Sequence, residues 1–348
     1  MTSSTESRKQ AIFDFLAEHP EASSSIIHSG INVKGELITT KRTLTEMVRI
    51  GIIKVLGVGR ATRYVVNPGH KLLASIDLEK YFETDATKRV VMKDYNFDLP
   101  QLLDGFHVFN NLELTHLQAL NNIYEQKLND LPQEIRKKEF ERLAIDLIWK
   151  SSQIEGNTYS LLETELLIKE QQETKGKTKE EATMILNHKI AIDFITHNLM
   201  FIQPLSIAKI ESIHRLLVDG LGVDYNIRSR AVGITGTSFR PLDNQFQIRE
   251  ALENMCRLVN NQQDVFTKAF LTLCLISYIQ PFNDGNKRTG RIVSNAILMA
   301  EGVCPLSFRT VESIDYKKAM LLFYEQNNLQ AMKNIFIEQF EFAVETYF

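Results

Sequence analysis

The chain has 348 residues, of which 44% are apolar and 24% charged, which is ordinary for a globular protein. Its net charge of −3 excludes a chain that binds polyanions with its whole surface, and its apolar runs are too short to predict a membrane partner. The three cysteines lack the spacing of a metal site. Together with an N-terminus that has no signal-peptide pattern, they favour a cytoplasmic location.

Residues 1–68 are predicted to form a small domain of their own. Two short amphipathic patterns and a third around 39–49 precede two β-like runs, 52–56 and 61–66, which flank a glycine-containing turn. Three helices followed by such a hairpin resemble a winged helix-turn-helix. The polar side chains of the third helix and the hairpin that are predicted to contact DNA are Lys41, Arg42, Thr45, Arg49, Arg60 and Arg63.

The charge of this module supports DNA binding modestly. Nine cations and six acids between Met1 and Val66 give it a charge of +3, so the remainder of the chain carries −6. A basic module on an acidic body suits contact with DNA phosphates. Contact with another protein, or packing between domains, stays open as the alternative.

The rest of the chain is predicted to be a connector and then a helical domain. Residues 69–113 show no clear period and are expected to pack on the domain that follows, 114–348. The run at 265–279 is apolar all round, which indicates a central buried helix. The helical patterns fall at 114–128, 132–155, 161–170, 179–198, 206–221, 247–260, 265–279, 287–301, 313–326 and 329–346.

The most informative segment lies between two apolar runs and reads Gln-Pro-Phe-Asn-Asp-Gly-Asn-Lys-Arg-Thr-Gly-Arg, from Gln280 to Arg291. Its glycine and asparagine residues tolerate positive φ, so the backbone can curl into a nest of N–H groups at the start of the next helix. Asp284 could hold Mg²⁺ between itself and phosphate oxygens. The residues predicted to contact a nucleotide are Gly285, Asn286, Lys287, Arg288, Gly290 and Arg291.

This segment resembles the signature of the Fic (Fido) family, His-x-Phe-x-(Asp/Glu)-Gly-Asn-(Gly/Lys)-Arg-x-x-Arg. Every defining position matches except the first, where Gln280 replaces the catalytic histidine. The resemblance covers roughly residues 115–340 and implies a mainly α fold: an all-helical core with a small β-hairpin flap. It also implies ATP and Mg²⁺ as cofactors, with AMP transferred to a Ser, Thr or Tyr hydroxyl of a target protein.

Two other segments resemble parts of the same family. The segment 230–241 resembles the flap that clamps the target's main chain, although a plain structural hairpin is the alternative. Its docking residues would be Val232, Gly233, Ile234, Thr235 and Gly236. An exposed edge of this kind can accept an extended peptide by strand addition.

At the end of the helix predicted near 132–156, the residues Ser-Ser-Gln-Ile-Glu-Gly resemble the inhibitory motif (Ser/Thr)-x-x-x-Glu-(Gly/Asn). This resemblance makes Ser151, Glu155 and Gly156 an inhibitory element. The resemblance implies that Glu155 pairs with Arg291 and keeps the γ-phosphate of ATP out of its reactive pose. A carboxylate on a guanidinium is a strong charge-assisted contact that competes with phosphate. An ordinary helix-terminal glutamate is the alternative.

Gln280 governs how much activity the resemblance implies. The family's histidine takes the proton of the target hydroxyl, which a glutamine amide cannot do. The sequence is compatible with a weak or silent nucleotide sensor, an engineered inactive variant, or transfer with a different base. Lys287 stands where many AMP-transferring members have glycine, and some relatives with lysine there transfer phosphate instead.

The function predicted is therefore an ATP-binding protein that resembles protein adenylyltransferases, autoinhibited through Glu155 and weakened by Gln280. The alternative is a DNA-binding regulator whose Fic domain senses nucleotide. The predicted partners are ATP and an unidentified protein, and DNA and a homodimer stay open.

Overall fold

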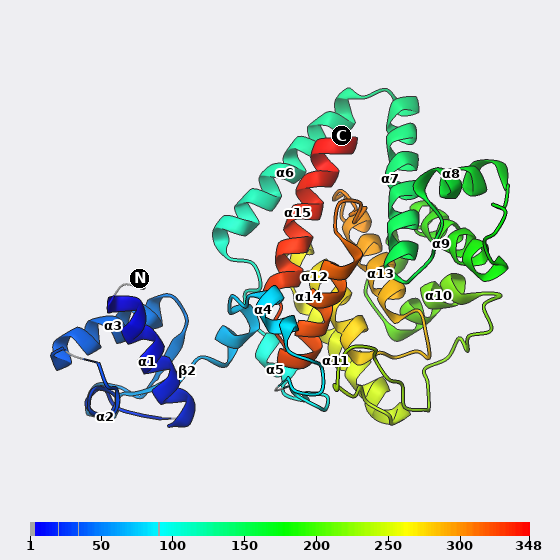
Figure 1. Cartoon of the computed structure of the whole chain (residues 1–348). Helices are drawn as coiled ribbons and strands as arrows, with labels where there is room; N and C mark the ends of the chain where they lie inside the picture. The colour runs from blue at the N-terminus through cyan, green and yellow to red at the C-terminus, as the bar shows by residue number, and fades with distance from the viewer. Residues whose placement is uncertain (1–3, 20, 34, 90) are drawn as a thin grey trace. The chain divides into compact units, whose positions relative to one another are not determined.

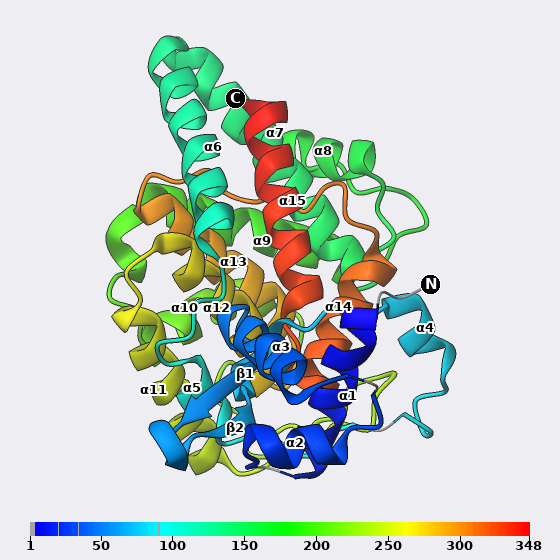
Figure 2. The ribbon, with the colours of Figure 1, turned by 90° about the vertical axis from the view of Figure 1, so that its left-hand side faces the viewer.

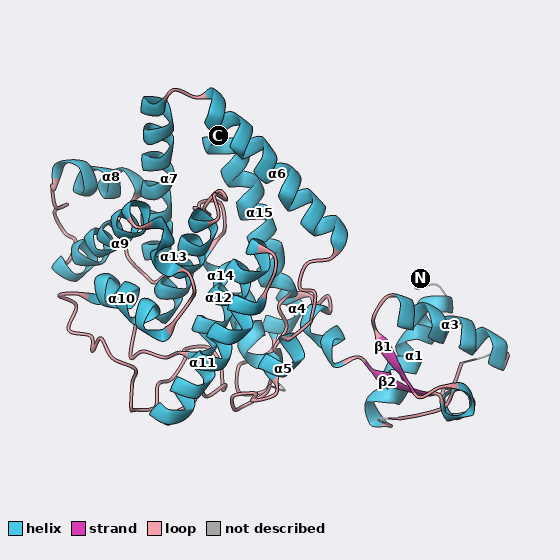
Figure 3. Ribbon diagram, turned by 180° about the vertical axis from the view of Figure 1, so that it is seen from behind, coloured by secondary structure: helices cyan, strands magenta, loops and turns pink. Residues whose placement is uncertain are grey.

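The computed structural model describes residues 4–19, 21–33, 35–89 and 91–348. It is mainly helical, as the sequence predicts, and the described strands form one small hairpin (Figure 3). The chain divides into two compact units, Met1–Ala74 and Ser75–Phe348. The division comes a few residues after the boundary predicted at 68. Residues 1–3, 20 and 34 of the predicted N-terminal domain lie outside the described residues.

The N-terminal unit has the predicted order of three helices and a hairpin (Figure 1). Its core is apolar and draws side chains from each helix and the first strand, among them Ile12, Ile27, Leu44 and Ile53. The two strands pair antiparallel. The elements are α1 (Ser4–Glu18), α2 (Ser24–Gly30), α3 (Leu37–Arg49), β1 (Ile53–Leu56), η1 (Gly59–Ala61), β2 (Arg63–Val66) and η2 (Pro68–Leu73).

The second unit begins with an irregular connector that contains α4 (Leu78–Glu83) and α5 (Leu99–Leu103). Its main chain runs beside a later loop, because the Arg240 N–H donates to the carbonyl of Lys93 at 2.7 Å. A hydrogen bond from the Met92 N–H to the carbonyl of Glu325, 2.9 Å long, holds it to the helical core.

The helical core follows, and its boundaries lie close to the sequence patterns. It consists of α6 (Asn111–Asp130), α7 (Gln133–Ile154), α8 (Leu161–Glu170), α9 (Lys179–His197), η3 (Leu199–Ile202), α10 (Ile207–Val218), α11 (Gln245–Asn261), α12 (Val265–Ile279), α13 (Asn286–Ala300), α14 (Ser313–Gln326) and α15 (Gln330–Tyr347).

Helix α12 is the centre of this core, as its apolar sequence predicts. Every residue from Phe266 to Ile279 is buried except Lys268. The Asp264 carboxylate caps its start by accepting the Thr267 N–H at 2.7 Å. Helix α13 packs closely along it, because a Cβ added at Gly290 would lie 3.0 Å from a backbone oxygen of α12.

Helices α6 and α15 lie side by side along one edge of this unit (Figures 1 and 2). Lys333 of α15 reaches the Glu113 carboxylate of α6 at 2.8 Å. Asn110 and Glu113 also form a capping box, which fixes where α6 begins. The C-terminal helix is therefore part of the core.

The segment 230–241, predicted to be a β-hairpin flap, forms no strand. It is a loop with a turn at Thr235 and Gly236, so the hairpin prediction is wrong for this segment. A lone two-stranded hairpin is only marginally stable, and the described residues form no neighbouring sheet for it to join. We call residues 230–241 the flap loop.

Across the described residues, no helix combines the length and apolar character that crossing a membrane requires. The same residues contain no group of three or more His, Cys, Asp or Glu side chains arranged to hold a metal ion. The cysteines Cys256, Cys274 and Cys304 are buried and free.

Candidate nucleotide site

The turn between α12 and α13 begins and ends with left-handed residues. Gln280 ends α12 with φ 51°, and Gly285 precedes α13 with φ 80°. A Cβ at Gly285 would meet the Val218 side chain at 3.0 Å, so glycine suits both the backbone angle and the available space. Helix α13 starts at Asn286, one residue before the start that the sequence pattern predicts.

Asn286 holds this turn together from inside. Its side-chain oxygen accepts the Phe282 N–H at 2.8 Å, and its amide nitrogen donates to the carbonyl of Phe282 at 2.8 Å and to Gln280 Oε1 at 3.0 Å. Gln280 in turn donates its own amide to the carbonyl of Ser277 at 2.6 Å. Both side chains are buried, so the amide at the position of the motif histidine is fixed within the turn.

His214 supports the turn from α10. Its ring stacks on Phe282 with 3.6 Å between centroids, and Nε2 lies 3.0 Å from the carbonyl oxygen of Asp284. Burial lowers the pKa of His214 to about 4, so the ring is neutral near pH 7 and donates Nε2–H to that carbonyl. His214 therefore supports the turn structurally.

The charged residues of the turn occupy two environments. Arg288 is buried and pairs at 2.8 Å with the carboxylate of Asp284, whose side chain is 66% exposed. Lys287 is half-buried, and its Nζ lies 2.9 Å from Glu155 Oε2. The turn thus presents Asp284 and Lys287 outward and keeps Arg288 behind them.

Glu155 follows the last turn of α7 and contacts two cations. Its Oε1 lies 2.9 Å from Arg291 Nη2, and Oε2 takes the contact with Lys287. Burial alone would raise the pKa of Glu155, but the charges of Arg291 and Lys287 outweigh it and lower the pKa from the usual 4.5 to about 2. The Glu155–Arg291 contact expected from the motif is therefore present, and Lys287 is a second partner that the sequence did not indicate.

Ser151 and His188 complete this contact. Arg291 donates Nε–H to Ser151 Oγ and Nη2–H to the Ser151 carbonyl, each at 2.9 Å. Burial lowers the pKa of His188 to about 3, and its Nδ1–H donates to the carbonyl of Met184 at 2.8 Å. His188 Nε2 therefore accepts from the Ser151 hydroxyl at 3.0 Å, which leaves the hydroxyl oxygen free to accept from Arg291.

These elements surround a cavity of about 530 Å³. The turn contributes Gln280 and residues 283–287, α7 contributes its C-terminal end with Glu155, and the flap loop contributes residues 232–235. Helix α14 supplies the remaining wall with Ile314, Lys317, Met320, Leu321 and Tyr324. The sequence reasoning missed this wall, because its residues form an ordinary amphipathic pattern.

Not every predicted site residue reaches the cavity. Arg288, Gly290 and Arg291 are buried behind its lining. Ser151 is also buried behind it, where it bonds Arg291. Gly156 has φ 101° and nothing within 4 Å of an added Cβ, so its glycine serves the backbone angle at the end of α7.

The flap loop is held by two arginines that the sequence did not single out. Buried Arg228 donates to the carbonyls of Gln280 and Arg230, each at 2.7 Å, and to that of Leu242. Burial lowers the pKa of Arg228 to about 10. At the loop's tip, Arg89 of the connector donates to the Gly236 carbonyl at 2.6 Å.

The candidate DNA-contacting residues all lie in the N-terminal unit. On α3, Lys41, Arg42, Thr45 and Arg49 are exposed, while Leu44 and Met47 of the same helix are buried. Arg60 is exposed in η1 between the strands, and half-buried Arg63 donates to the carbonyl of Thr62 at 3.0 Å. The helix therefore turns four of the six predicted side chains toward solvent.

Comparisons of sequence agree on one family. Residues 204–298, which include the flap loop and the turn, match the Fic/DOC family. The chain is 25% identical over 165 residues to protein adenylyltransferase fic-1 of Caenorhabditis elegans, a match covering 46% of this chain and 32% of that protein. It is 27% identical over 173 residues to protein adenylyltransferase Fic of Nematostella vectensis, covering 49% and 40%. The matches thus span a third to two fifths of these relatives.

Solved structures agree on the fold. A fragment of Fic-1 from C. elegans has a TM-score of 0.60 at 18% identity, covering 68% of this chain and 72% of that one. A Fic family protein from Desulfovibrio desulfuricans G20 has a TM-score of 0.57 at 18% identity, covering 69% and 74%. The helical unit therefore has the Fic fold, and residues 204–298 within it match the Fic/DOC family.

Proposed function

We propose that the cavity binds Mg-ATP and that the protein is an adenylyltransferase-like member of its family, restrained by Glu155 and weakened in transfer by Gln280. The observation that carries the proposal is the double ion pair of Glu155 with Arg291 and Lys287 at the rim of a cavity. Two cations drawn to one carboxylate beside a helix N-terminus are groups that a polyphosphate also attracts.

The adenine nucleotide would place its phosphates at the start of α13. The backbone N–H groups there have no partner within the first turn of the helix, and Lys287 lies beside them. A γ-phosphate and the Glu155 carboxylate cannot occupy the same position on Arg291. Glu155 is therefore expected to oppose the reactive pose of ATP, which is the inhibitory role that the motif predicts.

Asp284 fits a magnesium ion that comes with the nucleotide. Mg²⁺ typically takes one or two protein carboxylates, with phosphate oxygens and water completing its shell. Asp284 offers one exposed carboxylate at the cavity, and the described residues provide no cluster that would hold the ion alone. Bound there, the ion would neutralise phosphate charge.

Gln280 limits the transfer step. A target hydroxyl oxygen forms a bond to the α-phosphorus, the bond to pyrophosphate breaks, and the hydroxyl proton must go to a base. The Gln280 amide is not a base, and its two ends already bond Asn286 and Ser277. Loss of a general base typically costs about 10²–10⁴ in rate. Lys287 leaves open whether AMP or phosphate is the transferred group.

A target protein is expected to dock on the flap loop. Residues 232–235 line the cavity beside Gln280, and Gly233 and Thr235 are exposed. The main-chain bonds of this loop are the tethers of Arg228 and Arg89, the bridge of Arg240 to the connector, and a bond from the Phe239 N–H to Thr237 Oγ1. Its other main-chain groups are available to pair with an extended peptide. The hydroxyl of a Ser, Thr or Tyr in that peptide would face the nucleotide.

Calorimetry tests the nucleotide site. Glu155→Gly should bind Mg-ATP about tenfold more tightly than the unaltered chain, because charge-assisted contacts are worth about 1.5–3 kcal/mol. Glu134→Gly, at the exposed start of the same helix, should change nothing. Failure of Glu155→Gly to bind Mg-ATP would contradict the proposal.

Mass spectrometry tests the transfer chemistry. Adding Gln280→His to Glu155→Gly supplies an imidazole where the motif has one, and self-modification by AMP should appear or rise strongly. A phosphate adduct in place of AMP would assign the other group. No adduct from the double variant, in the presence of Mg-ATP that it binds, would show that the cavity is not a transferase site.

The exposed cations of α3 favour DNA binding as a second candidate function. Electrostatic binding to DNA predicts an affinity that falls steeply as salt rises. Replacing Lys41 and Arg42 with alanine should then weaken DNA binding, while Lys71→Ala, an exposed lysine of the same unit outside α3, should not. If the affinity for DNA changes neither with salt concentration nor with the replacement of Lys41 and Arg42, DNA binding through α3 is excluded.

A further inference from the structure

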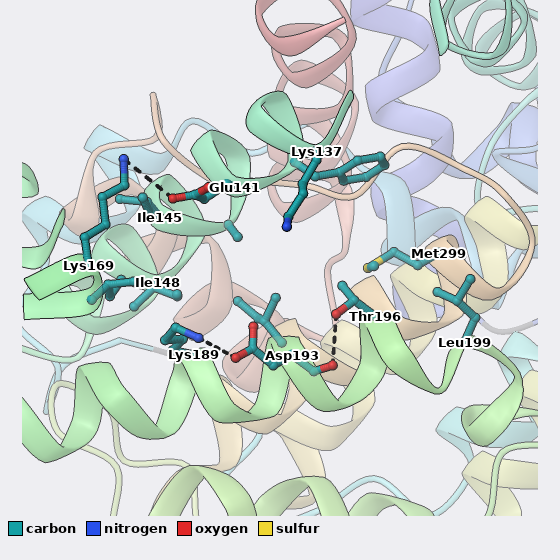
Figure 4. A pocket seen from close by; sticks show the side chains of 14 residues that line it. Lys137, Glu141, Ile145, Ile148, Lys169, Lys189, Asp193, Thr196, Leu199 and Met299 are labelled. Carbon is teal, nitrogen blue, oxygen red and sulfur yellow. Dashed lines mark hydrogen bonds and ion pairs between the residues drawn. The ribbon is translucent and has the colours of Figure 1, made fainter. Parts of the chain in front are cut away.

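A second pocket of about 700 Å³ lies outside the nucleotide site and shares no lining residue with it. Its walls come from α7, α8, α9, η3 and α13 (Figure 4). The floor is apolar and includes Ile145, Ile148, Ile168, Ile192 and Met299. Pockets of this size with an apolar lining and a few placed polar groups are typical of small-molecule sites.

Helix α7 forms one wall with a single face. Its lining residues recur at three- and four-residue steps, which places them in one stripe along the helix: Lys137, Phe140, Glu141, Ala144, Ile145 and Ile148. Ser151 and Glu155 continue this stripe, about 4.5 Å and about 10 Å beyond Ile148 at about 1.5 Å per residue. The same face of α7 thus serves this pocket and the contact with Arg291.

One of the three lysines that line the pocket, Lys137, has no ion-pair partner among the described residues. Three lysines and two carboxylates line the pocket. Lys169 Nζ lies 2.8 Å from Glu165, outside the lining, and 3.5 Å from Glu141. Lys189 pairs with Asp193 at 2.5 Å. Figure 4 shows the Lys137 side chain pointing into the pocket, and the described part of the chain supplies no ion-pair partner for it. Lys137 is therefore a lining cation without an ion-pair partner among the described residues, and it lies beside an apolar floor.

We propose that this pocket binds a small amphipathic carboxylate, with the anionic group on Lys137 and the hydrocarbon part against the isoleucines of α7, α8 and α9. The acid would gain a charge-assisted contact at the pocket's mouth and bury apolar surface below it. A cationic amphiphile would meet Lys137 with like charge, and a purely polar anion would gain nothing from the floor.

Calorimetry with decanoate on the full chain is the direct test. Decanoate should bind one to one, and Lys137→Met should weaken it about fivefold or more, as expected for loss of one charged partner near the surface. Lys138→Met is the matched control, because the neighbouring exposed lysine lies outside this pocket. Its affinity should equal that of the unaltered chain, and decyltrimethylammonium should not bind.

A second variant tests the floor. Ala144→Phe places a ring inside the pocket and should abolish decanoate binding while circular dichroism reports unchanged helix content. If that variant fails to fold, Ile148→Asn, a smaller polar change in the floor, should weaken binding in its place.

Three outcomes would overturn the proposal: no heat from millimolar decanoate, binding that Lys137→Met leaves unchanged, or equal binding of the cationic amphiphile. A dimer in sedimentation that Ala144→Phe breaks, without decanoate binding, would show instead that a second copy covers this face. Since the assay contains no nucleotide, none of these results depends on the function proposed for the other cavity.

Discussion

The two sides of the proposed nucleotide cavity are held in different ways. The turn between α12 and α13 is tied by hydrogen bonds among Ser277, Gln280, Phe282 and Asn286, all within ten residues of one another. The flap loop has no strand and is held through arginine side chains. The first wall is built by local sequence, whereas the tip of the second depends on residues far away in the chain.

The largest effect is expected at the distant tether of the flap loop. Arg89 donates to both carboxylate oxygens of Glu325, at 2.9 and 2.8 Å, and the Glu325 side chain is fully buried. Arg89→Met would leave that carboxylate with Tyr81 as its partner, so we expect a loss of about 3 kcal/mol in the free energy of unfolding. Urea denaturation measures it.

Arg240→Met is the matched control for this tether. Arg240 also lies on the flap loop, but its pair with Asp94 is 72% exposed on both sides, so its loss should cost no more than about 0.5 kcal/mol. Equal losses for the two variants would mean that Arg89 is not what holds the loop.

The second-largest loss of stability is expected from a substitution in the turn between α12 and α13. Asn286→Ala removes three hydrogen bonds and leaves the buried Phe282 N–H and Gln280 oxygen without partners, which should cost about 2 kcal/mol. Asn283→Ala, at an exposed position of the same turn, should be close to neutral in the same denaturation experiment. A neutral Asn286→Ala would show that the turn is held by its packing rather than by this side chain.

The same contrast explains what the sequence could predict. Helix α12 has the boundaries that its apolar run predicts, and the motif correctly pairs Glu155 with Arg291 across 136 residues. Both rest on patterns within a few neighbouring residues, one of periodicity and one of a shared motif. The hairpin predicted for the flap loop is wrong because the resemblance of a short segment to a hairpin predicts strands only where a partner strand exists, and the described part of this segment has none.

The residues that sequence reasoning missed are long-range partners. Arg228, His188 and Glu325 look like ordinary charged or polar residues in their own helices and loops. They become buried contacts only after the chain has folded, with Gln280, Ser151 and Arg89 respectively. One sequence carries no signal for such a pairing, because any arginine, histidine or glutamate could be solvent-exposed at the same place.

Acid should destabilise the fold through two buried histidines, His188 and His214. The pKa of His188 is lowered from 6.5 to about 3 and that of His214 to about 4, mainly by burial. Below pH 6.5 the unfolded chain binds protons at both positions while the folded chain does not, so stability falls with pH by up to about 1.4 kcal/mol per unit for each histidine. The loss for His214 should level off near pH 4.

Denaturation at pH 7.5 and 5.5 checks this acid effect. His188→Gln keeps an amide that can bond Ser151 and removes the titrating ring, so its loss over this range should be smaller than that of the unaltered chain. An identical slope for the unaltered chain and His188→Gln would contradict neutral burial of His188.

The smallest expected difference in stability is between alanine substitutions at two glycines, Gly236 in the flap loop and Gly285 in the turn. Gly236 and Gly285 have similar φ, 87° and 80°, so alanine at either position carries the same backbone strain of about 1 kcal/mol. At Gly236 an added Cβ meets Leu321 at an ordinary 3.5 Å, but at Gly285 it meets Val218 at 3.0 Å. Gly285→Ala should therefore cost about 1 kcal/mol more than Gly236→Ala in urea denaturation. Equal costs would mean that the turn yields as readily as the flap loop, and that its dense hydrogen bonding does not make it the more rigid wall.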